Sequence, residues 1–465
     1  MNINYPILLV IIAIYFAAMV AIGMVGRKKY GSSFQASISA NKNVGWLLFA
    51  GGAIGAHIGN GFVVGGASSA AASGLSGATY PIGCVLTYAL IAPIFTNKIW
   101  KTGQLTAPGI LKSYYKDNAT SIMFAIGTSV SYVGNVGVQI MAGKALFEAL
   151  GLNGSLGAVI IVAVILAYSA LSGLWGAFAT SVVQCGVITA GLIFGTIAIF
   201  KVDGIGAIGN AIAAGSVPET YFEFMPNGPS TLIFMLIPLT MALAADQGTV
   251  QRINSSKSLK DAWIGWIVSI LVMIPIAFMP ALIGMYGHVA FGASGTSAFF
   301  TTIISTMSPL VYSIIVAAVL SAIMSSCDSL MVGFNTVVLN DIYKGLVNPN
   351  ADDKALHKAD KLLTFVVSMV ALAIALVFNN IIDLLLAIGS FKSAMLFASF
   401  FGALYWKRGT SKGAVASSII GAVLFALGEF GFVAIPQHEL VAIAASGITY
   451  IVVSLATYKK PAVAA

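Results

Sequence analysis

The chain has 465 residues, of which 58% are hydrophobic and only 8% are charged, and its mean hydropathy is +0.96. A water-soluble protein needs charged residues at about a quarter of its positions, so this composition excludes a soluble enzyme. The formal charge of +8 does not by itself indicate nucleic acid binding, which requires basic residues gathered on one soluble face. We expect an all-α polytopic membrane protein.

Thirteen apolar segments are long enough to cross the hydrocarbon of a bilayer, which takes about 20 residues. In chain order they lie at 5–25, 45–72, 77–97, 120–150, 155–174, 177–200, 230–250, 262–288, 306–335, 362–379, 382–406, 413–433 and 439–457. The longest loops, 202–229 and 336–361, are too short to bury a core of their own. Residues 1–465 are therefore predicted to form a single integral membrane domain.

Basic residues predict the orientation, because the cytoplasmic loops of membrane proteins are rich in lysine and arginine. If the N-terminus lies outside, all 23 lysines and arginines fall in cytoplasmic loops or the C-terminal tail, except Lys144, Lys201 and Lys392. An odd number of spans then places the C-terminus inside. We expect a multi-pass protein of the plasma membrane, which in a bacterium is the cytoplasmic membrane, and no nucleic acid partner.

The second segment contains a dense run of glycine in the stretch GGAIGAHIGNGFVVGG, residues 51–66. Each glycine costs up to about 1 kcal/mol of helix propensity relative to alanine, so an unwound stretch is predicted from Gly55 to Gly61. Its freed carbonyls would be available to coordinate a cation or a substrate. Close helix packing also favours small residues, but packing alone does not explain the polar His57 and Asn60.

The seventh segment contains Pro238, followed by Asp246 and Gln247. A proline removes a backbone hydrogen bond, and an acid near membrane depth needs a partner, so this helix is also predicted to be interrupted. The alternative is a simple pair between Asp246 and Arg252 near the cytoplasmic end.

The second and seventh segments are five apart, as expected when broken helices occupy equivalent places in inverted repeats. The first five-helix repeat would span 45–200 and the second 230–406. One helix, 5–25, would precede this core, and two helices within 413–457 would follow it.

The ninth segment places Ser325 and Ser326 beside Asp328 in a long apolar helix. A small hard cation prefers oxygen ligands, and hydroxyls with backbone carbonyls can replace its water. Alternatively, the hydroxyls bond back to carbonyls four residues earlier.

Lys392 also falls within a predicted membrane span. It either faces a cavity, where it would neutralise Asp246, Asp328 or an anionic substrate, or reaches the outer interface.

Five stretches carry a resemblance along nearly the whole chain. They are FVVGGASSAAASGLSG after the second segment's predicted break, YSALSGLWGAFATSVVQ at 168–184, DQGTVQRINSSKSLKDA from 246, SAIMSSCDS followed by LNDIYK, and GALYWKRGTSKGAVASSIIGA near the end. In this order and spacing they resemble the sodium:solute symporter family, which includes bacterial proline, pantothenate, sialic acid and galactose symporters. The resemblance implies a LeuT-type core of two inverted five-helix repeats, with one preceding helix and two following helices.

The resemblance also implies a sodium site between the first and eighth core helices. Its ligands would be the backbone carbonyls of Gly55, Ile58 and Ala322 and the hydroxyls of Ser325 and Ser326. The family's substrate cavity lies at the same helix breaks. The candidates at matching places are His57, Asn60, Phe62, Tyr80, Asn135, Gln139 and Asp246. Lys392 is an eighth candidate, because it lies within a predicted span.

Two positions depart from the family's pattern. Many relatives carry an aspartate where this chain has Ser181, and that acid contributes to a second sodium site in some of them. A single Na⁺ is therefore expected as the coupling ion. The other departure is His57, where relatives often carry asparagine, aspartate or another neutral residue. A neutral histidine could bond the substrate, whereas a protonated one would repel sodium.

These features predict sodium-coupled uptake (symport) of a small polar organic solute, such as an amino acid or a carboxylate, by alternating access. The partners expected are that solute and the lipid bilayer, with no obligate protein partner. An enzyme is not expected, because the chain has no phosphate loop or nucleophile constellation. The alternatives are a transporter that is uncoupled or is driven by protons through His57 or Asp246, and a sensor or channel on the same scaffold.

Overall fold

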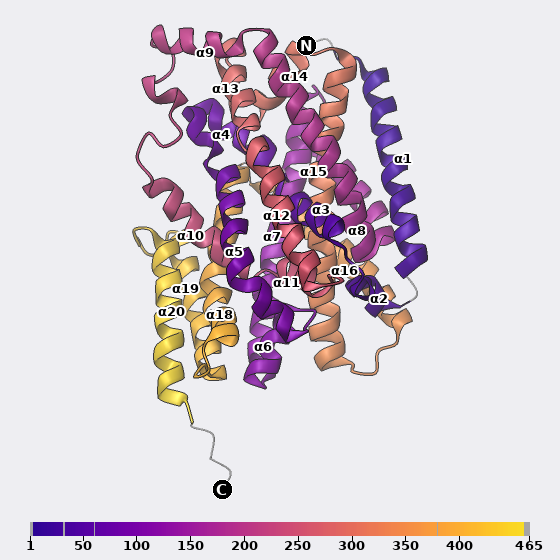
Figure 1. Cartoon of the computed structure of the whole chain (residues 1–465), viewed down its shortest axis with the longest axis vertical. Helices are drawn as coiled ribbons and strands as arrows, with labels where there is room; N and C mark the ends of the chain where they lie inside the picture. Colours follow the sequence, from indigo (N-terminus) through magenta and orange to yellow (C-terminus); the bar gives the residue numbers. More distant parts are fainter. Residues whose placement is uncertain (1–2, 31–32, 60, 379, 460–465) are drawn as a thin grey trace.

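The computed structural model describes residues 3–30, 33–59, 61–378 and 380–459. Within these residues all regular secondary structure is helical, apart from an isolated bridge between Val44 and Ser256. Most of the long helices run roughly along the long axis of the molecule (Figure 1). The all-helical prediction is confirmed.

The first part of the chain forms eight helices within the described residues. They are α1 (Tyr5–Tyr30), α2 (Phe34–Ser39), α3 (Trp46–His57), α4 (Gly66–Ser73), α5 (Thr79–Thr102), α6 (Ala107–Tyr115), α7 (Asn118–Ala149) and α8 (Gly154–Lys201). The remainder forms α9 (Gly204–Ala213), α10 (Ser230–Ala244), α11 (Gln247–Asn254), α12 (Leu259–Ile276), α13 (Met279–Phe291), α14 (Ser297–Thr306), α15 (Pro309–Thr336), α16 (Asp353–Val377), α17 (Ile381–Lys392), α18 (Ala398–Tyr405), α19 (Ser411–Glu429) and α20 (His438–Thr457). Short π-helical segments occupy Gly61–Gly65, Val337–Val347 and Ser393–Phe397.

Ten helices of the described chain are long and apolar enough to cross a membrane, or eleven if the bent pair α10 and α11 is one span. The sequence predicts thirteen. The difference lies in two apolar helices that are too short to qualify, Trp46–His57 and Gly154–Leu166. The first is short because α3 ends at a break in the second predicted segment.

The element α8 covers the fifth and sixth predicted segments, which are two helical stretches separated by a sharp kink. Gly173 sits at the kink with a φ of 55°, in the left-handed region that glycine adopts without the steric cost other residues meet. A Cβ at this position would also lie 2.7 Å from the hydroxyl oxygen of Ser37. The chain therefore breaks at Gly173 between two helical stretches, as the two predicted segments require.

The two predicted long loops are partly helical. The first, residues 202–229, contains α9, which lies at the top of Figure 1, and a short 3₁₀ turn at Glu219–Phe222. In the second, residues 336–361, the helix α15 continues as the π-helical segment Val337–Val347. The buried Ile208 of α9 and Leu339 of the π-helical segment show that both stretches pack against the bundle.

Apolar side chains cover much of the molecular surface. Leu9 and Ile14 of α1 are 62% and 65% exposed, and Leu271 of α12 and Ile448 of α20 are each 63% exposed. Large exposed apolar surfaces are unfavourable in water but suit contact with lipid. Long helices with such outer faces are those expected of a protein that crosses a membrane.

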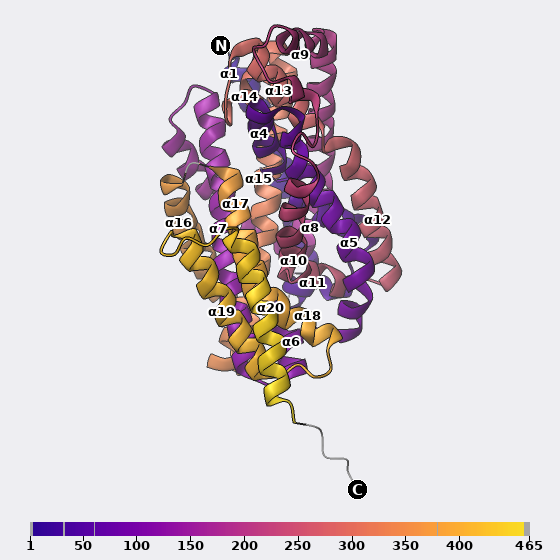
Figure 2. The ribbon, with the colours of Figure 1, turned by 90° about the vertical axis from the view of Figure 1, so that its left-hand side faces the viewer.

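The helix α15 lies at the centre of the bundle, and it packs against α1, α3, α7 and α8. Its side chains between Val316 and Asp328 are all buried. The helices α19 and α20 pack together at one side of the molecule, against the segment Ser393–Phe397 (Figure 2). The polar residues of α15 are therefore held inside protein, away from lipid.

Polar side chains cap several helices at their ends. Asp117 accepts a hydrogen bond from the backbone N–H of Ala119 at the start of α7, and Asn153 accepts one from Leu156 at the start of α8. Such caps satisfy backbone donors that have no partner within the helix. The hydroxyl of Ser411 also donates to Asp117, which joins α7 to α19 and lowers the pKa of this carboxyl group from its ordinary value.

Candidate functional site

The first broken helix is formed by α3 and the π-helical segment Gly61–Gly65. The helix α3 ends at His57, and Ile58 caps it, with its N–H donating to the carbonyl of Ile54 at 2.7 Å. The break therefore starts later than the predicted Gly55, which remains helical. Asn60 lies outside the described residues.

Close packing explains why the glycines before the break stay helical. A Cβ on Gly51 would lie 2.4 Å from a methyl carbon of Val182, and a Cβ on Gly52 would lie 2.5 Å from the ring of Phe178. Both contacts are with α8. The packing interpretation is therefore correct for these two glycines, whereas the interruption lies beyond them.

The second broken helix is formed by α10 and α11, whose axes are bent by 51°. Pro238 lies inside α10, and the interruption comes at Ala245 and Asp246 instead. The carboxylate of Asp246 accepts a hydrogen bond from the N–H of Thr249 at 3.1 Å and so caps α11. An acid at this helix N-terminus is stabilised by the exposed backbone donors and the helix dipole. The acid, rather than the proline, marks the break.

A cavity of about 130 Å³ lies between the two breaks and the helices α5, α7, α15 and α17. We call it the central cavity. Its lining includes six of the eight predicted substrate residues, namely His57, Tyr80, Asn135, Gln139, Asp246 and Lys392. Phe62 is instead fully buried in the hydrophobic core. The structure therefore gathers residues from five separate predicted segments around one cavity.

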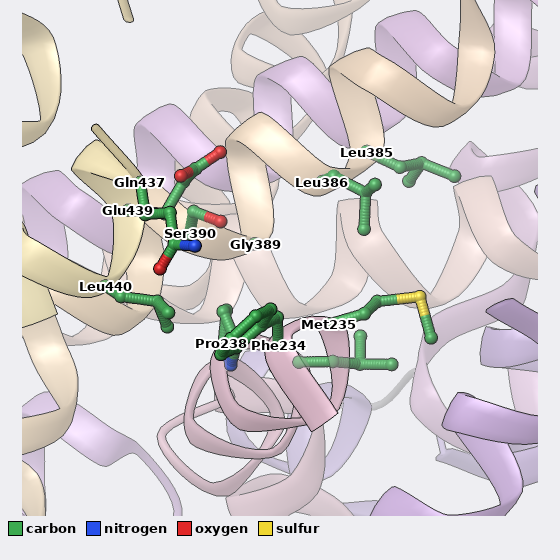
Figure 3. Close-up of a pocket in the computed structure, with 11 residues that line it drawn as sticks. Phe234, Met235, Pro238, Leu385, Leu386, Gly389, Ser390, Gln437, Glu439 and Leu440 are labelled. Atoms are coloured by element: carbon green, nitrogen blue, oxygen red, sulfur yellow. The ribbon is translucent and has the colours of Figure 1, made fainter. Parts of the chain in front are cut away.

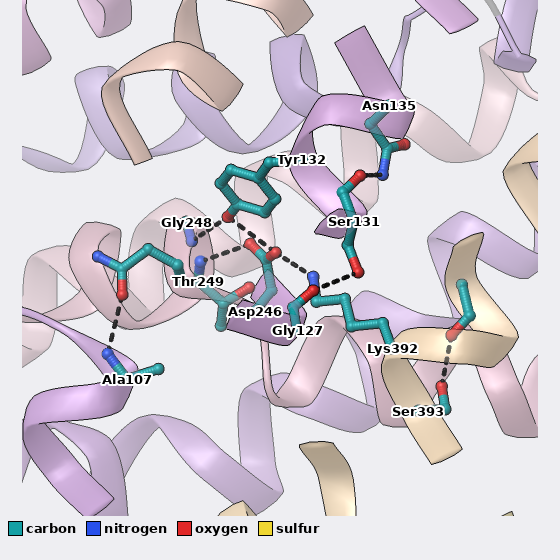
Figure 4. Close-up of polar contacts among 12 residues, drawn as sticks. Ala107, Gly127, Ser131, Tyr132, Asn135, Asp246, Gly248, Thr249, Lys392 and Ser393 are labelled. Atoms are coloured by element: carbon teal, nitrogen blue, oxygen red, sulfur yellow. Dashed lines mark hydrogen bonds and ion pairs between the residues drawn. The ribbon is translucent and has the colours of Figure 1, made fainter. Parts of the chain in front are cut away.

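Asp246 is the centre of a polar network on the wall of the central cavity (Figure 4). Its carboxylate forms an ion pair with Lys392 and accepts a hydrogen bond from the hydroxyl of Tyr132 at 2.9 Å. The same hydroxyl accepts one from the N–H of Gly248, also at 2.9 Å. Lys392 therefore faces the cavity rather than the outer interface, and its partner is Asp246. The alternative pair between Asp246 and Arg252 is not formed.

Arg252 is a cavity residue that the sequence places wrongly, among the basic residues of a cytoplasmic loop. Its side chain is only 2% exposed and lines the central cavity. One terminal nitrogen donates to the carbonyl of Gly52 at 3.1 Å. The guanidinium carbon lies 5.9 Å and 5.8 Å from the ring centroids of Phe49 and Phe178. Tyr132 is likewise absent from the predicted set, because a tyrosine in an apolar helix gives no signal of its own.

The serine pair of α15 contacts the first broken helix and α8. The hydroxyl of Ser326 donates to the carbonyl of Gly55 at 3.1 Å, and the hydroxyls of Ser325 and Ser181 lie 2.7 Å apart. These bonds run between helices, unlike the back-bond of Ser321 to Ala317. The alternative interpretation, in which the serine pair bonds only to its own helix, is therefore wrong.

Glycine at position 55 is required for this contact. A Cβ on Gly55 would lie 2.1 Å from the Ser325 hydroxyl oxygen and 3.0 Å from that of Ser181. Of the two other predicted sodium ligands, Ile58 caps the end of α3, and Ala322 precedes the serine pair by one helical turn. Both are fully buried. Neutral oxygen atoms from three helices thus meet at one buried place beside the central cavity.

His57 contacts Tyr88 of α5 next to this place. The hydroxyl of Tyr88 contacts the His57 Nδ1 atom and donates to the carbonyl of Ala53 at 2.6 Å. The two rings meet edge to face, with centroids 4.8 Å apart. One ring nitrogen of His57 is therefore engaged with protein, and the residue is oriented at the edge of the cavity.

Two further hollows adjoin the central cavity. One, of about 350 Å³, has Tyr80 in common with it and carries the polar side chains of Ser69, Ser73 and Ser76. The other, of about 230 Å³, lies between α10, α17 and the start of α20 and is mostly apolar (Figure 3). Tyr80 therefore lines both the central cavity and this second hollow, whose wall is largely apolar apart from the serines.

Comparison with known proteins agrees with this architecture. Residues 38–421 match the model of the sodium:solute symporter family. The high-affinity proline transporter PutP of Bacillus subtilis is 29% identical over 375 residues, which cover 75% of this chain and 77% of that protein. The sodium/pantothenate symporter of Haemophilus influenzae is 24% identical, with coverage of 76% and 78%.

Solved structures show the same fold. A Na⁺-coupled sialic acid symporter superposes with a TM-score of 0.83 at 18% sequence identity, covering 98% of this chain and 99% of that one. The arrangement of helices is therefore of the LeuT type. With a family match over most of its length, two interrupted helices and a cavity between them, the chain belongs to the sodium:solute symporter family and is a sodium-coupled solute transporter of the membrane, not an enzyme.

Proposed function

We propose that the solute binds in the central cavity and that one Na⁺ binds beside it, at the carbonyls of Gly55, Ile58 and Ala322 and the hydroxyls of Ser325 and Ser326. The observation that carries this proposal is the position of Ser326, which lines the cavity and also donates to the Gly55 carbonyl. One residue therefore contacts both sites. The ligand atoms are neutral oxygens, which suit a small hard cation.

Sodium would couple to the solute by holding α3 against α15. The ion bridges the broken helix and the serine pair, which stabilises the arrangement of the cavity that the solute needs. Each ligand then raises the affinity of the other by the same factor, and a coupling of about 1–3 kcal/mol corresponds to roughly 5–150-fold. When the cavity opens to the inside, these two helices separate and release the ion. A membrane potential adds about 2.3 kcal/mol per charge per 100 mV in the inward direction.

We infer thirteen membrane crossings in this protein, with α1 before the core and α19 and α20 after it. The two five-helix repeats would occupy 45–200 and 230–406, and the N-terminus would lie outside. The two apolar helices too short to count on length alone, Trp46–His57 and Gly154–Leu166, supply the missing crossings. The meeting of both broken helices at one cavity supports their equivalence in an inverted repeat.

The solute proposed is a small polar organic molecule, such as an amino acid or a carboxylate. The cavity is small, at about 130 Å³, and offers amide, hydroxyl and charged groups. The named relatives carry proline and pantothenate, which are solutes of this kind.

Uptake into liposomes tests the proposal. The purified chain is reconstituted, and a panel of labelled amino acids and carboxylates, including proline and pantothenate, is offered under an inward Na⁺ gradient. Accumulation that disappears when choline replaces sodium is the expected result. Equal accumulation under a pH gradient in sodium-free medium would overturn sodium coupling, and passive equilibration without accumulation would indicate a channel.

A further inference from the structure

The central cavity contains an uneven number of charged groups. Its formally charged lining residues are Asp246, Lys392 and Arg252. Asp246 and Lys392 form an ion pair with each other. Arg252 therefore has no direct ion pair of its own, and interacts with the carboxylate of Asp246 only at longer range.

The protein supplies hydrogen-bond acceptors for only part of the Arg252 guanidinium group. One terminal nitrogen donates to the Gly52 carbonyl, but the Nε and Nη1 atoms have no hydrogen-bond partner among the residues that the structure describes. Within the same part of the chain, the ion pairs join Lys392 to Asp246 and His438 to Glu429 and Glu439, so Arg252 takes part in none. The guanidinium group of Arg252 also contacts the rings of Phe49 and Phe178.

Asp246 forms no hydrogen bond or direct ion pair with Arg252 among the described residues. Its carboxylate oxygens already accept hydrogen bonds from the Tyr132 hydroxyl and the Thr249 N–H, besides the ion pair with Lys392. A buried charge without a partner is costly, and a partner supplied by the ligand offsets that cost. A guanidinium is also the group that matches a carboxylate by geometry, through two parallel N–H donors.

Sodium adds a positive charge beside the cavity. The proposed ion site consists of carbonyls and hydroxyls, and the buried acid Asp328 lies two residues beyond Ser326. A solute with a carboxylate would be attracted both by Arg252 and by the ion.

We propose that the transported solute carries a carboxylate group and that Arg252 binds it. This inference rests on the proposed function, because it assigns the substrate class of the same cavity. The solute can be a simple organic anion or a zwitterion, since both present the same group to the guanidinium. The pair Asp246 and Lys392 then positions Tyr132 and α11 and does not itself bind the carboxylate.

The test uses formate, the smallest carboxylate, as the probe. The full chain is purified in detergent, and its thermal unfolding is followed in sodium formate, in sodium chloride, and in sodium chloride with formamide, at one ionic strength. Formate is expected to stabilise the protein more than chloride or formamide. For Arg252→Gln, the formate concentration needed for half the effect should rise by about 10- to 100-fold.

Two variants keep the test decisive. Arg252→Lys retains the charge and should retain part of the formate effect. The control Lys201→Met removes a basic residue at an exposed helix end, far from the cavity lining, and should keep the full formate effect. Equal stabilisation by chloride or formamide in the wild type would overturn the inference, and so would an unchanged formate response in Arg252→Gln.

The carboxylate assignment and the proposed sodium-coupled transport can fail independently of each other. Sodium-driven accumulation of a neutral solute such as glucose would leave the proposed function intact and overturn the carboxylate assignment. Formate binding that is the same with sodium or choline would leave the assignment intact and count against sodium coupling.

Discussion

Lys392 of α17 and Asp246, at the break between α10 and α11, form an ion pair on the wall of the central cavity. Their side chains are 8% and 16% exposed. The pair therefore fastens the second broken helix to a helix far along the chain, at the depth where the cavity lies. Because Asp246 also caps α11, the pair and the broken helix depend on the same carboxylate.

Removing the lysine alone should destabilise the protein. Lys392→Met leaves the buried carboxylate of Asp246 without its counter-ion, and breaking a buried pair in this way costs about 3–5 kcal/mol. The double variant Lys392→Met with Asp246→Asn should recover part of this loss, because no charge is left unpaired. Thermal unfolding in detergent measures both, and Lys201→Met, at an exposed helix end, is the control. A double variant less stable than the single one would show that the pair is not what stabilises this region.

A methyl group at position 55 should disrupt the proposed sodium site. In Gly55→Ala the added carbon would lie 2.1 Å from the Ser325 hydroxyl oxygen, so α3 and α15 must move apart. The stabilisation that sodium gives to the wild-type protein should be lost. Gly186→Ala is the matched control, because nothing lies within 4 Å of a Cβ there. An unchanged sodium response in Gly55→Ala would place the ion elsewhere.

Reporter fusions test the proposed orientation. Alkaline phosphatase fused after Gly215, in the outer loop, should be active in a bacterial host, because it would be exported. The same enzyme fused after Lys459 should be inactive, whereas a fluorescent protein at that site should fluoresce. Phosphatase activity at Lys459 would show that the two termini lie on the same side or that the orientation is reversed.

The arrangement of helices was largely predictable, because apolar segments and loop charges report directly on the membrane. Both broken helices were also predictable, since a run of glycines and a buried acid are costly inside an ordinary membrane helix. Their exact positions were not. Gly51 and Gly52 stay helical because α8 packs against them, and Pro238 is accommodated within α10 while Asp246 ends it.

The site was predictable only where residue type is informative. Ser325, Ser326 and Lys392 are conspicuous in apolar helices, and the structure places them at the cavity or beside it. Phe62 does not line the cavity and Arg252 does, because which side of a helix faces a cavity depends on packing between distant segments. Arg252 lies near a predicted helix end, yet it turns inward between Phe49 and Phe178.

The most direct test of the central claim is sodium binding by the serine pair. Thermal unfolding of the purified protein is measured against increasing Na⁺, with choline keeping the ionic strength constant, for the wild type and for Ser325→Ala with Ser326→Ala. The wild type should be stabilised in a saturable way, and the double variant should remain folded without responding. The same sodium midpoint in both proteins would contradict the account.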